Sequence, residues 1–183
     1  EVSHDERYRI MTARHVLCHQ TGLSNWGQRD SSGHFNLLFT PGTDFGYSGE
    51  GFEYLKRVIE HITYKSISQI LNEELFIPLN LTNFYFKSNE YLKKYSAHGH
   101  LDLKPSDIRF LEKPMMAFSL FTEARSFSNF MLALRNKKGL KADTYNEMLS
   151  IQSTRNDSVH WGLGFQLENT PFGLSYGHSG STS

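Results

Sequence analysis

Apolar residues recur at helical spacing in the first part of the chain. Thr12 is expected to cap a short helix that runs to about Gln20, and Gly22 is its expected stop. A stretch rich in Ser, Gly, Asn and Asp over residues 24–46 predicts a loop. The clearest helical repeat follows this loop and forms one apolar face from Phe52, Leu55, Val58, Ile59 and Ile62.

Two further helices are predicted in the middle of the chain. Ser66 and Gln69 have the spacing of a capping box, and Pro78 ends the helix that they open. Residues 80–116 have no clear period and predict a long crossing segment with one or two short strands. Thr122 is the expected cap of the next helix. Its expected buried stripe is Phe127, Phe130, Met131 and Leu134.

The pattern changes from helical to extended near the C-terminal end. Residues 143–151 predict a short helix, and residues 161–167 predict a strand. Residues 169–173 have turn chemistry, and the chain returns as a second strand over residues 174–178. The sequence therefore predicts an α+β fold that is mostly helical and carries a C-terminal β-hairpin.

Composition narrows the functional classes. The 183 residues can bury one sizeable core, and 38% apolar with 14% aromatic content suits a globular fold. Lys plus Arg equals Asp plus Glu at 19 each, which does not favour a nucleic-acid partner, since such a partner needs a clustered basic face. The longest apolar runs are far shorter than the ~18 residues of a membrane span, so none is expected. With Cys18 alone, no internal disulfide can form.

Two short polar triplets, residues 47–49 and 178–180, are the candidate chemical features. Tyr47 precedes the clearest predicted helix, and His178 follows the last predicted strand. A phenol that faces a hydroxyl at a strand edge is one way to build a serine acyl-transfer site. Each residue also has a structural explanation, because tyrosines at such junctions usually pack and histidines at strand ends are often on the surface.

Two other kinds of site are weaker alternatives. Ser48 and Ser179 each lie in a near miss to the G-x-S-x-G nucleophile elbow, since the final glycine is absent. His15 and His19 are four residues apart, which is metal-ligand spacing on a helix, but Val16 stands where H-E-x-x-H needs a glutamate. We therefore expect no metal and no cofactor.

Six segments in order resemble one family, the serine β-lactamase-like hydrolases related to class C β-lactamases, D-alanyl-D-alanine carboxypeptidases and esterases. Residues 12–23 resemble the pattern T-x-x-H-L-L-x-H-T-S-G-L, and residues 39–49 resemble F-x-P-G-x-x-F-x-Y-S-N. The other four matching segments are residues 76–81, 117–127, 161–165 and 177–180. The matches span nearly the whole chain, and they also account for His15 and His19 without a metal.

The resemblance implies roles for the two triplets. Tyr47 occupies the tyrosine position of the Tyr-x-Asn motif and would shuttle a proton between nucleophile and leaving group. His178 occupies the first position of the Lys-Thr-Gly motif, and Ser179 would hydrogen-bond a substrate carboxylate or carbonyl. The backbone N–H of Ser181 would be one oxyanion-hole donor. The implied substrate-binding positions are Gly49, Ser179, Gly180 and Ser181.

Three departures from the family pattern limit these expectations. No serine in the chain has a lysine three residues later. In the family this Ser-x-x-Lys motif lies upstream of the first residue here, so we expect a fragment that forms no acyl-enzyme alone. Gly49 replaces the asparagine of the second motif, which lowers the expectation of lactam hydrolysis. His178 replaces the lysine of the third motif, and histidine titrates near neutral pH, which fits esterase or peptidase-like turnover better.

The chain is therefore expected to be a partial β-lactamase-like domain over residues 1–183, with a helical subdomain and active-site loops to about residue 155 and the start of a returning sheet over about residues 156–183. The intact parent would cleave an amide or ester of a small molecule or peptide through a serine acyl-enzyme. The remainder of the parent domain is an expected partner, and the family implies a periplasmic or secreted location. A catalytically dead sensor-like domain that binds peptide or cell-wall fragments and an α/β-hydrolase-like esterase remain the alternatives.

Overall fold

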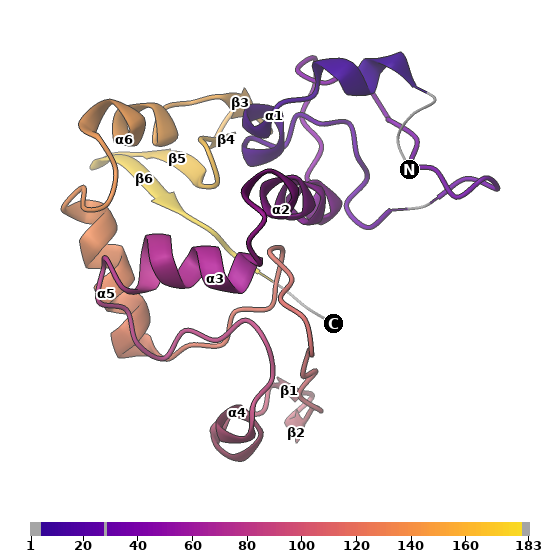
Figure 1. Ribbon diagram of the computed structural model, residues 1–183. Helices are drawn as coiled ribbons and strands as arrows, with labels where there is room; N and C mark the ends of the chain where they lie inside the picture. Colours follow the sequence, from indigo (N-terminus) through magenta and orange to yellow (C-terminus); the bar gives the residue numbers. More distant parts are fainter. Residues whose placement is uncertain (1–4, 28, 181–183) are drawn as a thin grey trace. The chain divides into compact units, whose positions relative to one another are not determined.

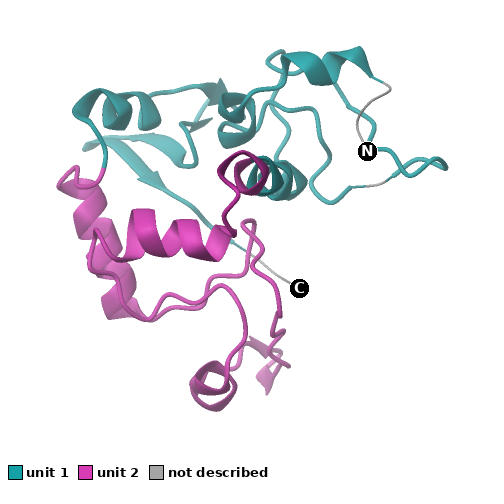
Figure 2. Ribbon diagram, in the orientation of Figure 1, with its two compact units in different colours: residues 1–58, 140–183 teal, residues 59–139 magenta. Residues whose placement is uncertain are grey.

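The computed structural model describes residues 5–27 and 29–180 of the chain, with its helices and strands labelled in Figure 1. The chain divides into two compact units. Unit 1 consists of residues 1–58 and 140–183, and unit 2 consists of residues 59–139 (Figure 2). Across the described ranges, no helix is both long enough and apolar enough to cross a membrane.

The N-terminal part of unit 1 packs around a small apolar cluster of Leu23, Phe35 and Leu37. This part begins with the 3-10 helix η1 (Glu6–Ile10) and continues into α1 (Ala13–Leu17). Burial of these apolar side chains anchors the polar loop that the sequence predicts between α1 and the next helix.

Helix α1 begins where the sequence predicts and ends earlier. The Oγ1 of Thr12 accepts a hydrogen bond of 3.3 Å from the backbone N–H of His15, so the predicted cap is confirmed. The helix ends at Leu17 and does not reach Gln20. The reason is the backbone of His19, whose φ of 58° lies in the left-handed region and cannot continue a right-handed helix.

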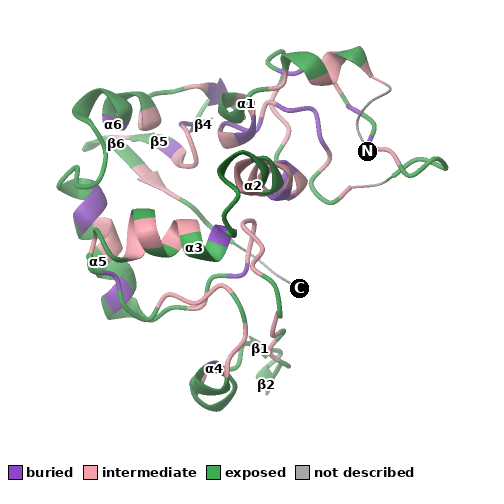
Figure 3. Ribbon diagram, in the orientation of Figure 1, coloured by how far each residue is buried: buried purple, intermediate pink, exposed green. Residues whose placement is uncertain are grey.

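Helix α2 (Gly49–Thr63) forms at the clearest sequence repeat but does not bury that face along its whole length. Ile62 is 66% exposed, and Val58 is also exposed. Figure 3 shows buried, half-buried and exposed segments along α2. The buried residues of α2 are Gly49, Gly51 and Glu53. A Cβ at Gly51 would already touch the Val16 side chain at 3.6 Å, so the helix packs most closely through its glycine-containing first turn.

The C-terminal part of unit 1 is a short helix followed by an antiparallel sheet. These elements are α6 (Ala142–Met148), β3 (Ser153–Thr154), β4 (Val159–Trp161), β5 (Gln166–Thr170) and β6 (Gly173–Gly177). The strands pair in the order β3-β4-β5-β6. The predicted hairpin is confirmed as β5 and β6, and the register closes at Thr170 opposite Gly173. Leu167 of β5 is fully buried and anchors the sheet.

The prediction of one strand over residues 161–167 is wrong, because a turn divides it. The N–H of Gly162 donates a hydrogen bond to the carbonyl of Phe165 at 2.9 Å, and Gly164 has a φ of 87°. A Cβ at Gly162 would lie only 2.2 Å from the carbonyl oxygen of Met148. The two glycines therefore permit a tight turn and a close approach to the end of α6.

Unit 2 is mainly helical. It begins within α2, at Ile59. The elements that follow are α3 (Ile67–Leu71), the π-helical segment η2 (Asn72–Phe76), α4 (Glu90–Tyr95), β1 (His100–Leu101), β2 (Lys104–Pro105) and α5 (Ala124–Arg135). The predicted cap of α3 is confirmed, since the Ser66 side chain accepts a hydrogen bond from the N–H of Gln69 at 3.3 Å. The predicted short strands are β1 and β2, whereas α4 was not predicted because it spans less than two turns.

Helix α5 starts at the predicted place with a different cap. The side chain of Glu123, and not that of Thr122, accepts hydrogen bonds from the N–H groups of Arg125 and Ser126. The predicted burial of Phe127 is also wrong, since this side chain is 41% exposed. Leu134 is buried as predicted. Because Phe127 is exposed, the buried stripe is narrower than the apolar pattern of the helix.

The observed elements confirm the predicted α+β fold class. Helices occupy most of the regular structure between Glu6 and Met148, and the antiparallel sheet follows from Ser153 onward. The sheet has four strands within the described residues, so it extends beyond the single hairpin that the sequence predicts.

Candidate active site

The structure brings Tyr47 and His178 together in unit 1. The phenol Oη and the imidazole Nε2 lie 3.4 Å apart, although the residues are separated by 131 positions in the sequence. Tyr47 comes from the loop immediately before α2, and His178 follows the last residue of β6. The predicted juxtaposition of the two residues is therefore confirmed, while their catalytic roles stay predictions.

The loop that carries Tyr47 is held by hydrogen bonds on both sides of the residue. The N–H of Gly46 donates to the carbonyl oxygen of His19 at 2.8 Å, and the N–H of Ser48 donates to His19 Nδ1 at 3.1 Å. The His19 and Tyr47 rings stack with centroids 4.2 Å apart. The position of the phenol is therefore set by His19, which the sequence singled out only through its metal-ligand spacing from His15 and its place in a family-like segment.

Trp161 joins the aromatic cluster around the pair. Its buried ring lies edge-on to the His178 ring at a centroid distance of 5.3 Å and edge-on to the His19 ring at 4.5 Å. Trp161 is the last residue of β4, so the sheet supplies a rigid ring beside the histidine at the end of β6. The sequence marked Trp161 as part of a family-like segment but carried no signal for this contact.

Burial shapes the electrostatics of this cluster. The pKa of His19 falls to about 4, mainly because burial penalises the charged imidazolium and secondly because of the charge of His178. Burial also raises the pKa of the Tyr47 phenol above its ordinary value. Near neutral pH the site therefore holds an uncharged His19 ring and a protonated phenol, which can donate a hydrogen bond or a proton.

The predicted substrate-binding residues lie in different environments. Gly49 is buried, and its N–H donates to Asn25 Oδ1 at 2.9 Å, so this donor is already engaged. Ser179 and Gly180 are exposed and directly follow His178. Ser181, the predicted oxyanion-hole donor, lies outside the described residues.

The geometry around Ser48 differs from that of a nucleophile elbow. Its Oγ donates to the Ser24 carbonyl at 2.9 Å and accepts a hydrogen bond from the N–H of Gly51 at 3.0 Å. The side chain is buried, and the loop before it contains no strand. Ser48 acts as a cap of α2. Ser179 follows β6 and is exposed, and no helix follows it within the described residues.

The histidine pair of the metal alternative is not on one helix face. His15 lies in α1, whereas His19 lies beyond the end of that helix with a left-handed backbone. Across residues 5–27 and 29–180, no three His, Cys, Asp or Glu side chains gather as ligands for a metal ion.

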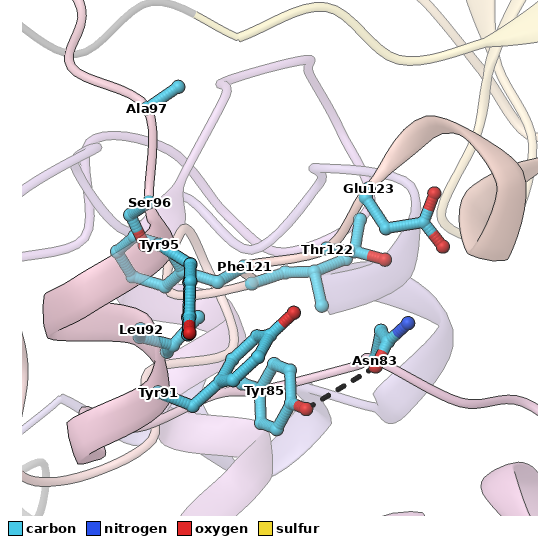
Figure 4. Close-up of a pocket in the computed structure, with 11 residues that line it drawn as sticks. Asn83, Tyr85, Tyr91, Leu92, Tyr95, Ser96, Ala97, Phe121, Thr122 and Glu123 are labelled. Carbon is cyan, nitrogen blue, oxygen red and sulfur yellow. Dashed lines mark hydrogen bonds between the residues drawn. The ribbon is translucent and has the colours of Figure 1, made fainter.

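A separate cavity of about 440 Å³ lies within unit 2 (Figure 4). Tyr85, Tyr91 and Tyr95 line it, with ring centroids 6.0 Å and 4.9 Å apart along this series. Among the described residues that line it, Glu123 is the one that carries a charge, and the carboxylate already caps α5. The cavity therefore offers aromatic surface, but its carboxylate is committed to the fold.

Comparison with known proteins gives a family match and a partial sequence relative. The model of the family described as Beta-lactamase matches residues 4–183. Protein flp of Staphylococcus aureus is 30% identical over 64 residues, which are 35% of this chain and 13% of that protein.

Solved structures with the same fold match more of the chain than this sequence relative does, but at lower sequence identity. A penicillin binding protein from Bacillus halodurans has a TM-score of 0.76 at 18% identity and covers 92% of this chain and 61% of its own. A D-stereospecific amidohydrolase from Streptomyces sp. has a TM-score of 0.74 at 20% identity over 100% of this chain and 64% of its own. EstCE1, a hydrolase with promiscuous acyltransferase activity, has a TM-score of 0.69 at 18% identity. The match covers 85% of this chain and 55% of EstCE1. The chain thus spans less than two thirds of each of these proteins.

Proposed function

Because the chain belongs to the beta-lactamase family, we propose that it supplies two of the three catalytic motifs of a serine acyl-transfer site. In this proposal the whole protein hydrolyses an amide or ester through a serine acyl-enzyme. The observation that carries the proposal is the 3.4 Å contact between Tyr47 Oη and His178 Nε2, which unites the second and third motifs in one place.

Tyr47 is proposed to relay the proton between the nucleophile and the leaving group. Its raised pKa keeps the phenol protonated at neutral pH, so it needs a nearby positive charge to act as a base. A lysine in the Ser-x-x-Lys pattern would supply that charge, and no serine in these 183 residues has such a lysine. The proposal therefore assigns the nucleophile and its lysine to sequence outside this chain.

His178 is proposed to orient the phenol, and the exposed Ser179 and Gly180 are proposed to line the substrate side. Gly49 offers no side-chain amide to an acyl group, and its N–H is engaged by Asn25. This favours an ester or a peptide-like amide over a lactam as the substrate. EstCE1 is a hydrolase with promiscuous acyltransferase activity, which supports hydrolysis through acyl transfer. The Streptomyces protein is a D-stereospecific amidohydrolase, which supports an amide as the bond that is cleaved.

The test uses the whole protein and a panel of p-nitrophenyl esters and D-amino acid amides. Turnover and a covalent serine adduct in intact-mass spectrometry are expected. Tyr47→Phe should lower kcat by about 10²–10⁴-fold, since general acid–base catalysis contributes about this factor. Tyr64→Phe, at an exposed tyrosine in unit 2, is the matched control and should keep full activity. Unchanged turnover in Tyr47→Phe would exclude the proposed proton relay.

The same experiment separates the alternatives. A whole protein that binds peptide or cell-wall fragments but forms no serine adduct would be a sensor-like domain. A fluorophosphonate adduct on Ser48 or Ser179 in this chain alone would support the elbow esterase instead. The buried, doubly hydrogen-bonded Oγ of Ser48 disfavours that reaction at Ser48.

A further inference from the structure

His19 adopts an uncommon backbone conformation in the interior of unit 1. It is 1% exposed, and its φ of 58° lies in the left-handed region. A non-glycine residue keeps such a conformation only where its surroundings hold it there. Here the conformation turns both the carbonyl and the side chain of His19 toward the segment that carries Tyr47, as the two hydrogen bonds from Gly46 and Ser48 show.

The two hydrogen bonds lie on either side of Tyr47. The His19 carbonyl accepts a hydrogen bond of 2.8 Å from the N–H of Gly46, which precedes Tyr47. The His19 Nδ1 accepts one of 3.1 Å from the N–H of Ser48, which follows Tyr47. An acceptor Nδ1 places the proton of a neutral imidazole on Nε2. Protonation of the ring would put a second proton on Nδ1 and remove the acceptor that Ser48 uses.

The ring of His19 adds a third contact. It stacks on the Tyr47 ring with an interplanar angle of 29° and meets the Trp161 ring at 88°. Both of these neighbours also contact the His178 ring, with centroid distances of 6.1 Å for Tyr47 and 5.3 Å for Trp161. His19 therefore touches the two aromatic side chains that flank His178.

We propose that His19 is the positioning residue for Tyr47. Its carbonyl and Nδ1 fix the backbone on both sides of the tyrosine, and its ring fixes the angle at which the phenol meets His178. The positioning role stands on the contacts within unit 1 alone. Its consequence for catalysis rests on the proposed function.

Two variants each remove one part of this role. His19→Asn keeps a short side-chain acceptor and tolerates a left-handed backbone, but it loses the ring. His19→Phe keeps an aromatic ring for stacking and loses the acceptor for Ser48. The matched control is His61→Asn, at an exposed histidine of α2.

The readout on this chain is NMR of the Tyr47 and His178 rings. Wild type and His61→Asn should give nuclear Overhauser contacts between the two rings and one Tyr47 ring environment. Both His19 variants should lose these contacts while they keep a cooperative thermal transition. Retention of the contacts and an unchanged Tyr47 phenol titration in both variants would overturn the proposal.

A measurement on wild type keeps the proposal testable if a variant does not fold. Long-range ¹H–¹⁵N correlation spectra at neutral pH should show His19 as the Nε2–H tautomer with an unprotonated Nδ1. A ring with its proton on Nδ1 could not accept from Ser48 and would contradict the proposed contact.

The whole protein then tests the catalytic consequence. His19→Phe should lower kcat by about 10–100-fold with little change in KM, because a displaced catalytic group affects the chemical step more than substrate binding. Equal losses in kcat for His19→Phe and His61→Asn would count against a specific role. If the wild-type whole protein shows no turnover, the proposed function fails while the NMR result still decides the positioning role.

Discussion

Ser153 Oγ donates a hydrogen bond of 2.5 Å to the carbonyl oxygen of Cys18, across 135 positions of sequence. Ser153 is the first residue of β3, and Cys18 directly follows the last residue of α1 and precedes His19. A second bond joins the same regions, from the N–H of Gly164 to the carbonyl of Leu17 at 2.9 Å. These bonds fix the sheet that carries His178 against the segment that holds Tyr47.

Ser153→Ala tests this link. The substitution leaves the buried Cys18 carbonyl without its side-chain donor, so we expect the free energy of unfolding to fall by about 1–3 kcal/mol. Urea denaturation measures the change. Ser158→Ala, at an exposed turn position, serves as the control and should change it by less than about 0.5 kcal/mol. Equal effects of the two substitutions would show that the hydrogen bond contributes little.

Gly162→Ala tests the turn that divides β4 from β5. The added Cβ would lie 2.2 Å from the backbone oxygen of Met148, and a backbone atom cannot rotate away. We expect the free energy of unfolding to fall by about 1–3 kcal/mol, as it does for other overpacked sites. Gly177→Ala is the control, because a Cβ there meets no atom within 4 Å. A variant at position 162 with wild-type thermal stability would mean that the turn relaxes easily.

The lowered pKa of His19 predicts an acid-dependent loss of stability. The folded state holds the neutral ring with a pKa of about 4, against an ordinary value of 6.5, so the unfolded chain binds a proton first as pH falls. Stability from this group is therefore full above pH 6.5 and is lost as pH falls toward 4, by at most about 3 kcal/mol. Urea denaturation of wild type and His19→Asn between pH 7 and pH 4 measures the difference. The gap between them should narrow toward pH 4, and a constant gap would contradict the prediction.

Substitutions at the start of α5 compare the cap in the structure with the cap that the sequence predicted. Glu123→Ala removes the acceptor for the N–H groups of Arg125 and Ser126, so we expect a lower urea midpoint. Thr122→Ala should leave the midpoint nearly unchanged, since the Thr122 side chain does not cap the helix. The reverse order of the two effects would restore the sequence-based assignment.

Tyr47→Phe should leave the folded chain almost as stable as wild type. The Tyr47 side chain is partly exposed, and its Oη makes a long contact of 3.4 Å with His178, so the change should stay within about 0.5 kcal/mol. Tyr8→Phe is the contrast, because Tyr8 Oη donates a hydrogen bond of 2.7 Å to the Phe35 carbonyl. Removing this hydroxyl should lower the free energy of unfolding by about 1 kcal/mol. A large loss for Tyr47→Phe in thermal unfolding would mean that its hydroxyl supports the fold rather than the site.

The sequence determined the features that depend on a few neighbouring residues. Thr12 and Ser66 cap their helices as predicted, and the hairpin of β5 and β6 forms at the predicted turn. Side-chain caps, apolar periods and turn residues act over one or two turns of chain, so they can be recognised without coordinates. The six ordered segments likewise located Tyr47 and His178 as candidates.

Tertiary structure alone decided how those candidates meet. His19 has a left-handed backbone and accepts hydrogen bonds from both neighbours of Tyr47. The ring of Trp161 lies beside His178. These contacts join residues that are distant in sequence. Only the tertiary structure decided which residues are exposed, because the apolar repeat of α2 does not predict how much of that face other residues cover. Such contacts depend on the packing of the whole unit, and local residue preferences are too weak to specify them.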